Sequence, residues 1–390
     1  MSHETTAAGK RFQITPVRLL VGGILLLGLI VTFLRFTQGL GEVTNLDHNT
    51  PWGLWITFDL LCGVALAAGG FVTSAAVYIF GLNKYHSAVR PAVLTGFLGY
   101  ALVVLALTYD VGIPWRLPYP FLVQPGPSSF LFEVGLCVAL YLTVLFLEIS
   151  PAGLEWLGKS RLRKIVVKMT LVLTILGVVL STLHQSSLGG LYLIVPSKLH
   201  PLWYSSYLPL EFFVSSIVAG LSMVIFEGAL SYRFLGHKMD REHIQHKDDL
   251  AIGFAKAGSL VLAGYFFIQL TGLAADNDWS YLGTGYGAWY ILEMGGFVAL
   301  PCLLFALGAR EKNVRLIRWT AVLAVLGIVL NRFNVSLVAF NWHLASDQRY
   351  FPSWMEFVIS IFLVTLGVLA YTFVVTRMPV LYEHPEYAEE

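Results

Sequence analysis

Carboxylates and one histidine occur inside long apolar stretches of this sequence, where ionisable side chains are costly. Asp59, Glu133 and Glu227 each have apolar flanks, and His184 stands beside Gln185 near the end of another apolar run. A charged group in the middle of a bilayer costs several kcal/mol unless it is paired or hydrated. Residues of these types at these positions therefore predict work that involves charge or protons.

His184 is the histidine best placed for proton chemistry. It is the only one of the 10 histidines inside a predicted membrane helix, and Gln185, Ser186 and Ser187 follow it. Imidazole titrates close to neutral pH, so His184 is suited to deliver a proton to a bound molecule. The alternative is a structural histidine whose nitrogens are satisfied by its neighbours.

The sequence offers no paired ligands for a redox centre. A membrane haem held by two imidazoles needs two histidines inside the membrane, and the remaining histidines fall in termini, loops or their edges. Cys62, Cys137 and Cys302 are far apart and lack the spacing of metal ligands, so we interpret them as core residues. We therefore expect no haem, no iron–sulfur cluster and no metal of the chain's own.

The elements that position these residues are predicted to be membrane helices. Hydrophobic residues make up 56% of the chain and charged residues 13%, with a mean hydropathy of +0.70, whereas soluble domains carry about 25% charged residues. A bilayer core needs about 20 apolar residues per helix. Ten stretches qualify: 17–37, 52–82, 91–112, 129–149, 165–185, 209–232, 251–275, 286–309, 315–337 and 353–376.

The first of these stretches is predicted to be a retained helix. Lys10 and Arg11 precede it, but no small-residue cleavage site follows, as a secretory signal would require. The net charge of +1 indicates no particular partner, and the sequence has no phosphate-binding loop and no basic patch for nucleic acid.

Basic residues in the loops predict the orientation of the chain. The loops after the even-numbered stretches carry most of the lysine and arginine, and the other loops carry only Arg116, Lys198 and Arg349. By the positive-inside rule both termini lie in the cytoplasm of a bacterial inner membrane. The outer loops are rich in tryptophan, tyrosine and proline, which indicates either an interfacial aromatic belt or a docking platform for an external subunit.

Most of the polar residues in the membrane are predicted to lie in its outer half. Glu211 and Glu356 begin helices, where they could simply interact with the helix dipole, and Arg332 could form a structural ion pair with Glu293 or Glu356. Clustering at one depth is expected of a polar pocket reached from the lipid. The outer-half residues are Asp59, Asp110, Glu133, His184, Glu211, Glu293, Arg332 and Asn334, whereas Glu148 and Glu227 lie toward the cytoplasm.

Two pairs of segments are similar to each other. LFEVG at 131–135 matches ILEMG at 291–295, and TLVLTILGVVL at 170–180 matches TAVLAVLGIVL at 320–330. Such self-similarity indicates a duplicated unit. We predict an all-α integral membrane protein of ten transmembrane helices. Two parallel-repeated four-helix bundles, at 52–185 and 209–337, are flanked by helices 17–37 and 353–376.

Several motifs together resemble a known family. They are PWGLWITFD at 51–59, Gly69-Gly70, Arg90-Pro91-Ala92, Asp110-Val111-Gly112, His184-Gln185-Ser186-Ser187, HPLW at 200–203, VIFEG at 224–228, SLVAFN at 336–341 and YFPSW at 350–354. From about residue 17 to 376 the sequence resembles the NrfD/polysulfide-reductase membrane-subunit family. Within that family it is most similar to the HybB-type subunits of respiratory uptake [NiFe] hydrogenases.

The resemblance implies partners and a substrate. Subunits of this kind react with quinone in the outer half of the first bundle and carry few cofactors. A periplasmic ferredoxin-like iron–sulfur subunit docks on them, with the small and large hydrogenase subunits beyond it. One departure concerns Ile113, which stands where a basic residue is expected after Asp110-Val111-Gly112, with Arg116 three residues later.

We therefore predict a quinone-reactive subunit that passes electrons between the iron–sulfur subunit and menaquinone, with coupling to proton translocation left open. It would contribute the quinone site of a hydrogen:quinone oxidoreductase but not the hydrogenase centre. The predicted quinone-binding residues are His184, Asp59, Gln185, Trp52 and Trp55, and the predicted proton relay residues are Glu133, Asp110 and Glu227.

Three alternatives stay open. The partner could be another oxidoreductase of the same family, acting on polysulfide or nitrite. The chain could be a passive anchor, with quinone reacting elsewhere. It could also be a secondary transporter whose carboxylates and Arg332 bind a solute, although the parallel repeat and the outer-half position of the polar residues differ from the usual transporter pattern.

Overall fold

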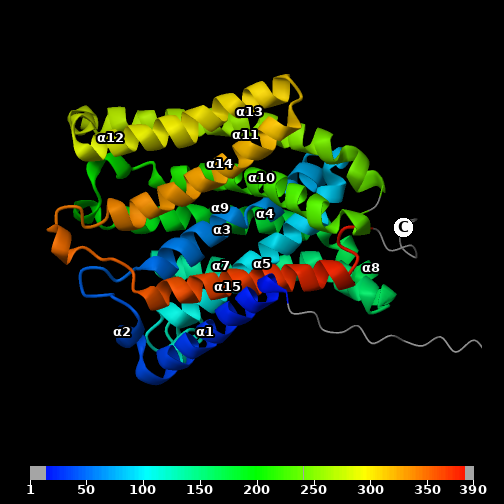
Figure 1. Ribbon diagram of the computed structural model, residues 1–390, viewed down its shortest axis with the longest axis horizontal. Helices are drawn as coiled ribbons and strands as arrows, with labels where there is room; N and C mark the ends of the chain where they lie inside the picture. The colour runs from blue at the N-terminus through cyan, green and yellow to red at the C-terminus, as the bar shows by residue number, and fades with distance from the viewer. Residues whose placement is uncertain (1–14, 240, 383–390) are drawn as a thin grey trace, which may run out of the picture.

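The molecule is a bundle of long, roughly parallel and antiparallel helices (Figure 1). The computed structural model describes residues 15–239 and 246–382, together with the helical backbone of 241–245. Within them ten helices are long and apolar enough to cross a membrane, so the chain is a multi-pass integral membrane protein and the all-α prediction is confirmed. The spans are Pro16–Gln38, Trp55–Ile79, Asn83–Asp110, Phe130–Trp156, Thr170–Leu193, Leu208–Lys238, His246–Ala275, Gly285–Arg310, Val314–Val338 and Trp354–Arg377.

Several spans differ from the predicted stretches at their ends. The seventh was predicted at 251–275, but helix α11 begins at Arg241 and runs to Ala275. An apolar stretch ends where charged residues begin, but the helix can continue. Its backbone satisfies its own hydrogen bonds in water as well as in lipid.

The two ends of the bundle differ in character. At the first, which we call the aromatic end, lie α2 (Leu40–Val43) and α12 (Gly285–Leu292), together with the loop that precedes α15 (Trp354–Arg377). At the other, the basic end, lies α8 (Ser160–Lys168), with the turn between α10 (Leu208–Leu235) and α11. This separation follows the alternation of basic loops along the sequence.

The helices form two groups with the same order of neighbours. In the first, the second membrane span contacts α5 (His86–Asp110) and α9 (Thr170–Leu193), and α7 (Phe130–Trp156) contacts both of these helices. In the second, α10 contacts α11 and α14 (Val314–Phe333), and α13 (Leu300–Arg310) contacts both. A duplicated four-helix unit would pack in this way. The parallel repeat and its boundaries stay predictions.

The two groups meet where α10 packs against α9 and α4 (Gly69–Ser74). Glycines allow this approach, because a Cβ atom on Gly220 would lie 2.7 Å from backbone atoms of Ala68 and Gly69. Small residues let helices pack closely in membranes, where no hydrophobic driving force brings the helices together.

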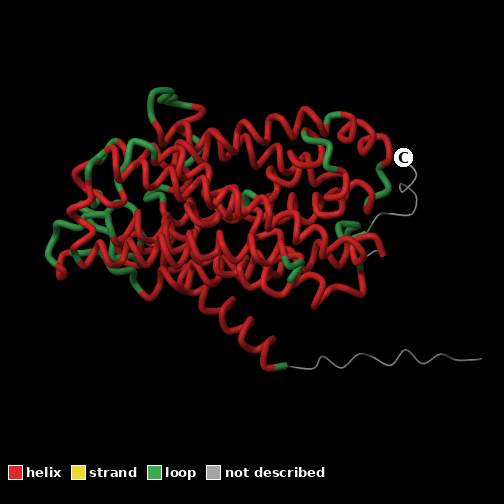
Figure 2. Tube along the Cα trace, turned by 90° about the horizontal axis from the view of Figure 1, so that it is seen from above, coloured by secondary structure: helices red, strands yellow, loops and turns green. Residues whose placement is uncertain are grey.

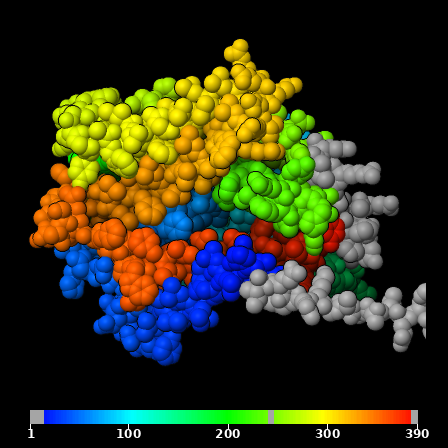
Figure 3. Space-filling model, viewed as in Figure 1, coloured from blue at the N-terminus to red at the C-terminus, as the bar shows by residue number. Residues whose placement is uncertain are grey.

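The helix α1 (Pro16–Gln38) lies at one edge of the molecule, beside α15 (Figure 1). Figure 2 shows its N-terminal half leaving the body of the bundle, and Figure 3 shows it along one border of the surface. Its exposed side chains are large and apolar, among them Leu20, Leu26 and Phe33. They are suited to contact lipid.

Arg35 on α1 differs from these lipid-facing residues, because it is charged and only 2% exposed. Its Nε donates a hydrogen bond of 2.6 Å to the carbonyl of Tyr109, and its Nη2 donates one of 2.8 Å to the carbonyl of Val111. The last carbonyls of a helix have no partner within the helix. Arg35 therefore caps the C-terminal end of α5 and fixes α1 to it.

Replacing Arg35 by methionine is expected to lower the free energy of unfolding by about 2–4 kcal/mol, because two hydrogen bonds from a charged donor are lost and buried carbonyls are left unpaired. Thermal unfolding in mild detergent measures the effect. The control is Arg315→Met at an exposed position, which should change stability by less than about 0.5 kcal/mol. Equal effects of the two variants would contradict the capping role.

Wide helical turns occur where polar residues enter the membrane helices. The π-helical segments η1 (Trp55–Cys62), η9 (Glu293–Ala299) and η10 (Asn334–Val338) contain Asp59, Glu293 and Asn334, respectively. A π-helical turn shifts the register of the side chains that follow it, and such turns occur often at functional sites. The π-helical turns therefore point polar side chains in directions that regular α-helical spacing would not give.

An aromatic cluster orders the loops at the aromatic end. The ring of His200 lies 4.5 Å from that of Tyr286 and 4.8 Å from that of Trp342, centroid to centroid. Its Nδ1 accepts a hydrogen bond of 3.2 Å from the Leu202 amide. His200 is only 2% exposed, and burial lowers the pKa of its imidazole to about 4.

The pKa of His200 predicts a loss of stability in acid. The unfolded chain binds a proton at this residue near pH 6.5, whereas the folded chain resists protonation down to about pH 4. Folding therefore loses about 2 kcal/mol at this site between pH 7 and pH 5. His200→Asn should shrink the difference in melting temperature between these two pH values, and His48→Asn in an exposed loop should not. Equal pH dependence of His200→Asn and the native chain would contradict this assignment.

Candidate functional site

Five polar residues pack together inside the first group of helices. This first polar cluster consists of Tyr100 from α5, Tyr141 from α7, and Ser181, His184 and Gln185 from α9, each 0% exposed. The ring centroid of Tyr100 lies 4.6 Å from that of Tyr141 and 5.7 Å from that of His184.

Many polar atoms of this cluster have no hydrogen-bond partner among the described residues. They include both ring nitrogens of His184 and the hydroxyls of Tyr100, Tyr141 and Ser181. Gln185 Nε2 donates a hydrogen bond of 3.0 Å to the carbonyl of Val64, but its Oε1 is free. Because most buried polar groups are hydrogen-bonded, such a cluster is suited to hold water or the polar atoms of a ligand. A purely structural histidine would have its nitrogens hydrogen-bonded by neighbours, and no described residue bonds to those of His184.

Asp59 and Trp55 lie on another face of the second membrane span, against α15. Ser360 donates a hydrogen bond of 2.7 Å to Asp59 Oδ2. The indole Nε1 of Trp55 donates one of 3.1 Å to the carbonyl of Glu356. Trp55 is 1% exposed, whereas Asp59 is half-buried.

Asp110 belongs to the same region, at the aromatic end of α5. It lies within electrostatic range of Arg35 and Glu356. Glu356 accepts hydrogen bonds from the Tyr350 hydroxyl and, at 2.8 Å, from the Ser353 amide at the start of α15. The interpretation of Glu356 as a group at a helix start is thus confirmed. We call Arg35, Asp59, Asp110, Glu356 and Ser360 the α15 cluster.

Trp52 lies apart from Trp55 and packs against aromatic rings near the aromatic end. Its ring centroid lies 6.0 Å from that of Tyr192 and 6.3 Å from that of Phe340. Tyr192 follows Gln185 by two helical turns on α9 and so shares its face. Trp52 therefore stands above the first polar cluster, toward the aromatic end.

The predicted quinone residues thus occupy two places. His184 and Gln185 lie in the first polar cluster, with Trp52 above it. Asp59 lies in the α15 cluster, and Trp55 lies beside it through its bond to the Glu356 carbonyl. The second membrane span carries contacts to both, since Gln185 binds the carbonyl of Val64. In the described part of the chain no hydrogen bond or ring contact joins His184 to Asp59.

The predicted relay residues lie in three separate places. Glu133 is half-buried in the first turn of α7, one turn before Cys137. Asp110 belongs to the α15 cluster. Glu227 lies in the part of α10 toward the basic end, where it accepts a hydrogen bond of 2.5 Å from Thr95.

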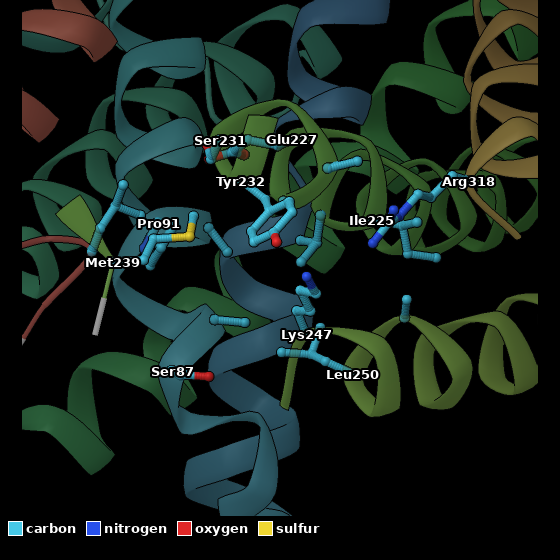
Figure 4. Close-up of a pocket in the computed structure, with 17 residues that line it drawn as sticks. Ser87, Pro91, Ile225, Glu227, Ser231, Tyr232, Met239, Lys247, Leu250 and Arg318 are labelled. Carbon is cyan, nitrogen blue, oxygen red and sulfur yellow. The ribbon is translucent and has the colours of Figure 1, made fainter. Parts of the chain in front are cut away.

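Glu227 also borders a small cavity of about 80 Å³ between α5, α10 and α11. Figure 4 shows Glu227 and Ser231 at one edge of this cavity and Lys247 and Leu250 at another. The Nζ of Lys247 lies 3.3 Å from the ring centroid of Tyr232, so that cation is directed at an aromatic face rather than at Glu227.

A second polar network is built around Glu293 in the second group of helices. Glu293 is 3% exposed and accepts three side-chain hydrogen bonds. The donors are Asn331 Nδ2 at 2.7 Å, Trp203 Nε1 at 2.8 Å and Asn334 Nδ2 at 2.6 Å. Glu211, near the start of α10, belongs to the same region through a bond of 3.1 Å from Gln269 Nε2.

Arg332 completes this network without an ion pair. It is 0% exposed and donates to Asn331 Oδ1 at 2.8 Å and to Ser215 Oγ at 2.8 Å, with its guanidinium carbon 3.8 Å from the ring centroid of Phe212. Among the described residues no carboxylate lies within ion-pair distance of it. The ion pair with Glu293 or Glu356 that the sequence left open is therefore not formed.

These features define a class of protein: a polytopic membrane protein with polar clusters buried among its helices. The family model for "Polysulphide reductase, NrfD" matches residues 42–343. The chain belongs to this family, which confirms the resemblance seen in its motifs.

Three relatives are similar to this chain over most of its length. A protein of Nitratidesulfovibrio vulgaris is 63% identical over all of both chains. The probable Ni/Fe-hydrogenase 2 b-type cytochrome subunit of Escherichia coli is 34% identical over 98% of this chain and 96% of its own. The integral membrane subunit of menaquinone reductase of N. vulgaris is 28% identical over 92% of this chain and 90% of its own.

The second of these relatives corrects one prediction. Its name is that of a b-type cytochrome subunit, a haem protein, so the prediction that this chain binds no haem is wrong as a conclusion from sequence. His184 offers two free ring nitrogens that are suited to ligate a metal. A second buried histidine does not face it among the described residues, since His200 lies at the aromatic end and His86 is exposed. The donor set does not fit a haem held by two imidazoles.

Several residues of these clusters were missed in the sequence. Arg35, Tyr100, Tyr141 and Ser360 each stand in an apolar helix and carry no motif of their own. A signal did exist on two helices, because Tyr141 and Glu148, like Thr174 and Ser181, are seven residues apart and so share a face. Ser360 and Arg35 had no such signal, since their partners come from distant segments.

Proposed function

We propose that this chain is the quinone-reactive membrane subunit of a respiratory oxidoreductase, and that its catalytic partner is a [NiFe] hydrogenase. Membership of the NrfD family and full-length similarity to the hydrogenase 2 subunit support this partner. The similarity to a menaquinone reductase subunit supports menaquinone as the substrate. Electrons would pass between a periplasmic iron–sulfur subunit docked on the aromatic end and a quinone in the membrane.

His184 is the residue that best supports a quinone site in this chain. A quinone ring presents two carbonyl oxygens on opposite edges, and its reduction requires two electrons and two protons. Among the described residues neither nitrogen of His184 has a hydrogen-bond partner, and Gln185 Oε1 has none either. His184 would donate a hydrogen bond to one quinone oxygen and then its proton.

The other quinone oxygen would face Asp59, which is half-buried and held by Ser360. Trp52 and Trp55 would provide apolar walls, since pockets for ring ligands are mostly apolar with few polar groups. Glu133, Asp110 and Glu227 would pass protons. Because each occupies a different place, they would serve separate branches rather than one path.

The proposed orientation places the chain in a bacterial cytoplasmic membrane with both termini inside. The basic end would face the cytoplasm by the positive-inside rule, and the aromatic end would face the periplasm. The ordered aromatic cluster around His200 supports a firm docking surface there.

Affinity purification of the native complex in mild detergent tests the proposed function. Co-purification of nickel, iron, a ferredoxin-like subunit and bound quinone is the expected result. Iron and quinone without nickel would retain the family role and replace the hydrogenase by another oxidoreductase. A lone chain that lacks metal and quinone but takes up solute in vesicles would overturn the proposal in favour of a transporter.

A further inference from the structure

A polar cavity opens among the described residues at the basic end of the first group of helices. Its volume is about 500 Å³, and it lies between α5, α7, α8 and α9. A cavity of this size holds several water molecules, since each occupies about 30 Å³ in the liquid. Polar lining residues include Ser74, Tyr78, Arg90, Glu148, Glu155 and Arg163.

The rim of this cavity is a fixed charged group. Arg90 donates two hydrogen bonds to the carboxylate of Glu155, at 3.0 and 2.8 Å, and Arg163 Nε donates a third at 2.8 Å. Arg90 also donates to the carbonyl of Pro379 at 2.9 Å. The Glu155 carboxylate on α7 thus binds one guanidinium from α5 and one from α8, and these bonds hold the three helices together.

Glu148 is the carboxylate in the cavity that the rim does not use. Its Oε1 accepts a hydrogen bond of 3.1 Å from Thr174, and no cation within the described residues pairs with it. It is half-buried on the face of α7 that points to α9. An uncharged hydroxyl is its one side-chain partner among the described residues, so its second oxygen is available to water.

A polar seam between α7 and α9 leads from Glu148 to the first polar cluster. Tyr141 stands two turns beyond Glu148 and Ser181 two turns beyond Thr174, about 10 Å along the helices. The Tyr141 hydroxyl lies beside Ser181 and the backbone of Phe71. The Tyr100 hydroxyl lies beside Ser181 and Gln185, next to His184.

The hydroxyls along this seam are buried and have no hydrogen-bond partner within the described ranges. They belong to Thr73, Ser74, Tyr100, Tyr141 and Ser181, and Ser74 also lines the cavity. Buried polar atoms without protein partners are the ones that internal water satisfies. Water between Ser74 and Tyr141 would bridge the distance from the cavity to the first polar cluster.

We infer that this cavity is a proton-uptake site, in which Glu148 takes a proton from water at the basic end and passes it along the seam of hydroxyls and internal water to His184. The inference rests on the proposed function for the destination of the proton. One proton leaves bulk water and replaces the one that His184 gives to a quinone oxygen, while the electrons arrive from the iron–sulfur partner at the other end. Quinone reduction would then consume protons from the basic side.

A labelling experiment tests the water path without any catalytic partner. In a chain whose three cysteines are replaced by alanine, Ser74→Cys should react with a membrane-impermeant thiol reagent applied at the basic end. It should not react when the reagent is applied only at the aromatic end. The matched control is Thr143→Cys, an exposed site on the outward face of α7, which should stay unlabelled because lipid suppresses the thiolate. An unreactive Ser74→Cys, or one labelled from the aromatic end, would overturn the inlet.

Proton uptake by the purified complex in liposomes tests the role of Glu148. Glu148→Gln should lower the rate of quinone reduction at least 10-fold while leaving the KM for quinone unchanged, and Glu148→Asp should restore part of the rate. Glu311→Gln, in the exposed turn after α13, is the control and should keep the native rate. Native-rate reduction by Glu148→Gln, with protons still taken from the basic end, would refute the assignment.

The two proposals fail in different ways. A native complex that reduces no quinone refutes the proposed function, and the labelling of Ser74→Cys then decides whether the inlet exists. A native complex that reduces quinone with protons from the aromatic end leaves the proposed function intact and refutes the inlet.

Discussion

Glu293→Leu is expected to lower the free energy of unfolding by about 3–5 kcal/mol, the range for removing one partner from a buried charged network. Glu293 accepts hydrogen bonds from Asn331, Trp203 and Asn334. Leucine fills a similar volume but leaves three buried donors without acceptors, and each costs about 1–3 kcal/mol. Residual water and small shifts offset part of that sum.

Thermal unfolding in detergent measures this loss through the buried thiols. Cys62 and Cys137 are free and buried, so a thiol-reactive dye reports their exposure as the chain unfolds. Glu293→Gln retains one acceptor oxygen and should lose about half as much stability as Glu293→Leu. Glu311→Leu at an exposed position should stay within about 0.5 kcal/mol of the native chain.

The comparison also decides what the second polar network does. If Glu293→Leu unfolds at the native temperature, the network has no structural role, and Glu293 and Arg332 become candidates for a second functional site. If Glu293→Gln is stable but the complex loses quinone reduction, the network supports turnover in addition to the fold.

His184→Leu is expected to reduce quinone reduction by the assembled complex about 100-fold, the lower range for loss of a general acid. The side chain is 0% exposed and neither nitrogen has a partner among the described residues, so leucine breaks no hydrogen bond to any of them. Stability should therefore stay close to native or rise. A loss of activity without a loss of stability distinguishes a quinone ligand from a structural histidine.

Steady-state assays with a soluble menaquinone analogue measure this effect. His237→Leu, at an exposed position near the basic end, is the matched control and should keep the native rate. His184→Gln retains a hydrogen-bond donor without the titrating ring, so it should keep quinone affinity better than His184→Leu while losing turnover. Native turnover in a correctly assembled His184→Leu complex would remove His184 from the site.

The sequence predicted the fold class because the bilayer imposes it. Backbone groups in lipid must be paired within a helix, and about 20 apolar residues are needed to cross, so apolar windows located all ten spans. The windows failed only at ends such as that of α11, where a helix continues into water. The family followed from the resemblance of short motifs, such as HQSS at 184–187, and the family model confirmed it.

The candidate site could be predicted only as a set of residue types at one depth. Periodicity places Ser181, His184 and Gln185 on neighbouring positions of one helix, but it does not say which helix they face. The expectation of no haem came from counting histidines, and a relative's name as a cytochrome subunit overturned it. A count of ligands in one sequence does not reveal what a family binds.

The sequence by itself determined the ten membrane helices, the alternation of basic and aromatic ends, and the presence of costly polar residues within apolar segments. Only the tertiary structure decided which of these residues meet. Asp59 bonds to Ser360, 301 residues away, and Arg35 bonds to the carbonyl of Tyr109, 74 residues away, near the end of α5. The sequence also could not show that Arg332 would be held by amides and a hydroxyl rather than a carboxylate. The reason is physical: helix packing in lipid depends on the shape of whole faces, and a single polar residue finds its partner only after those faces have met.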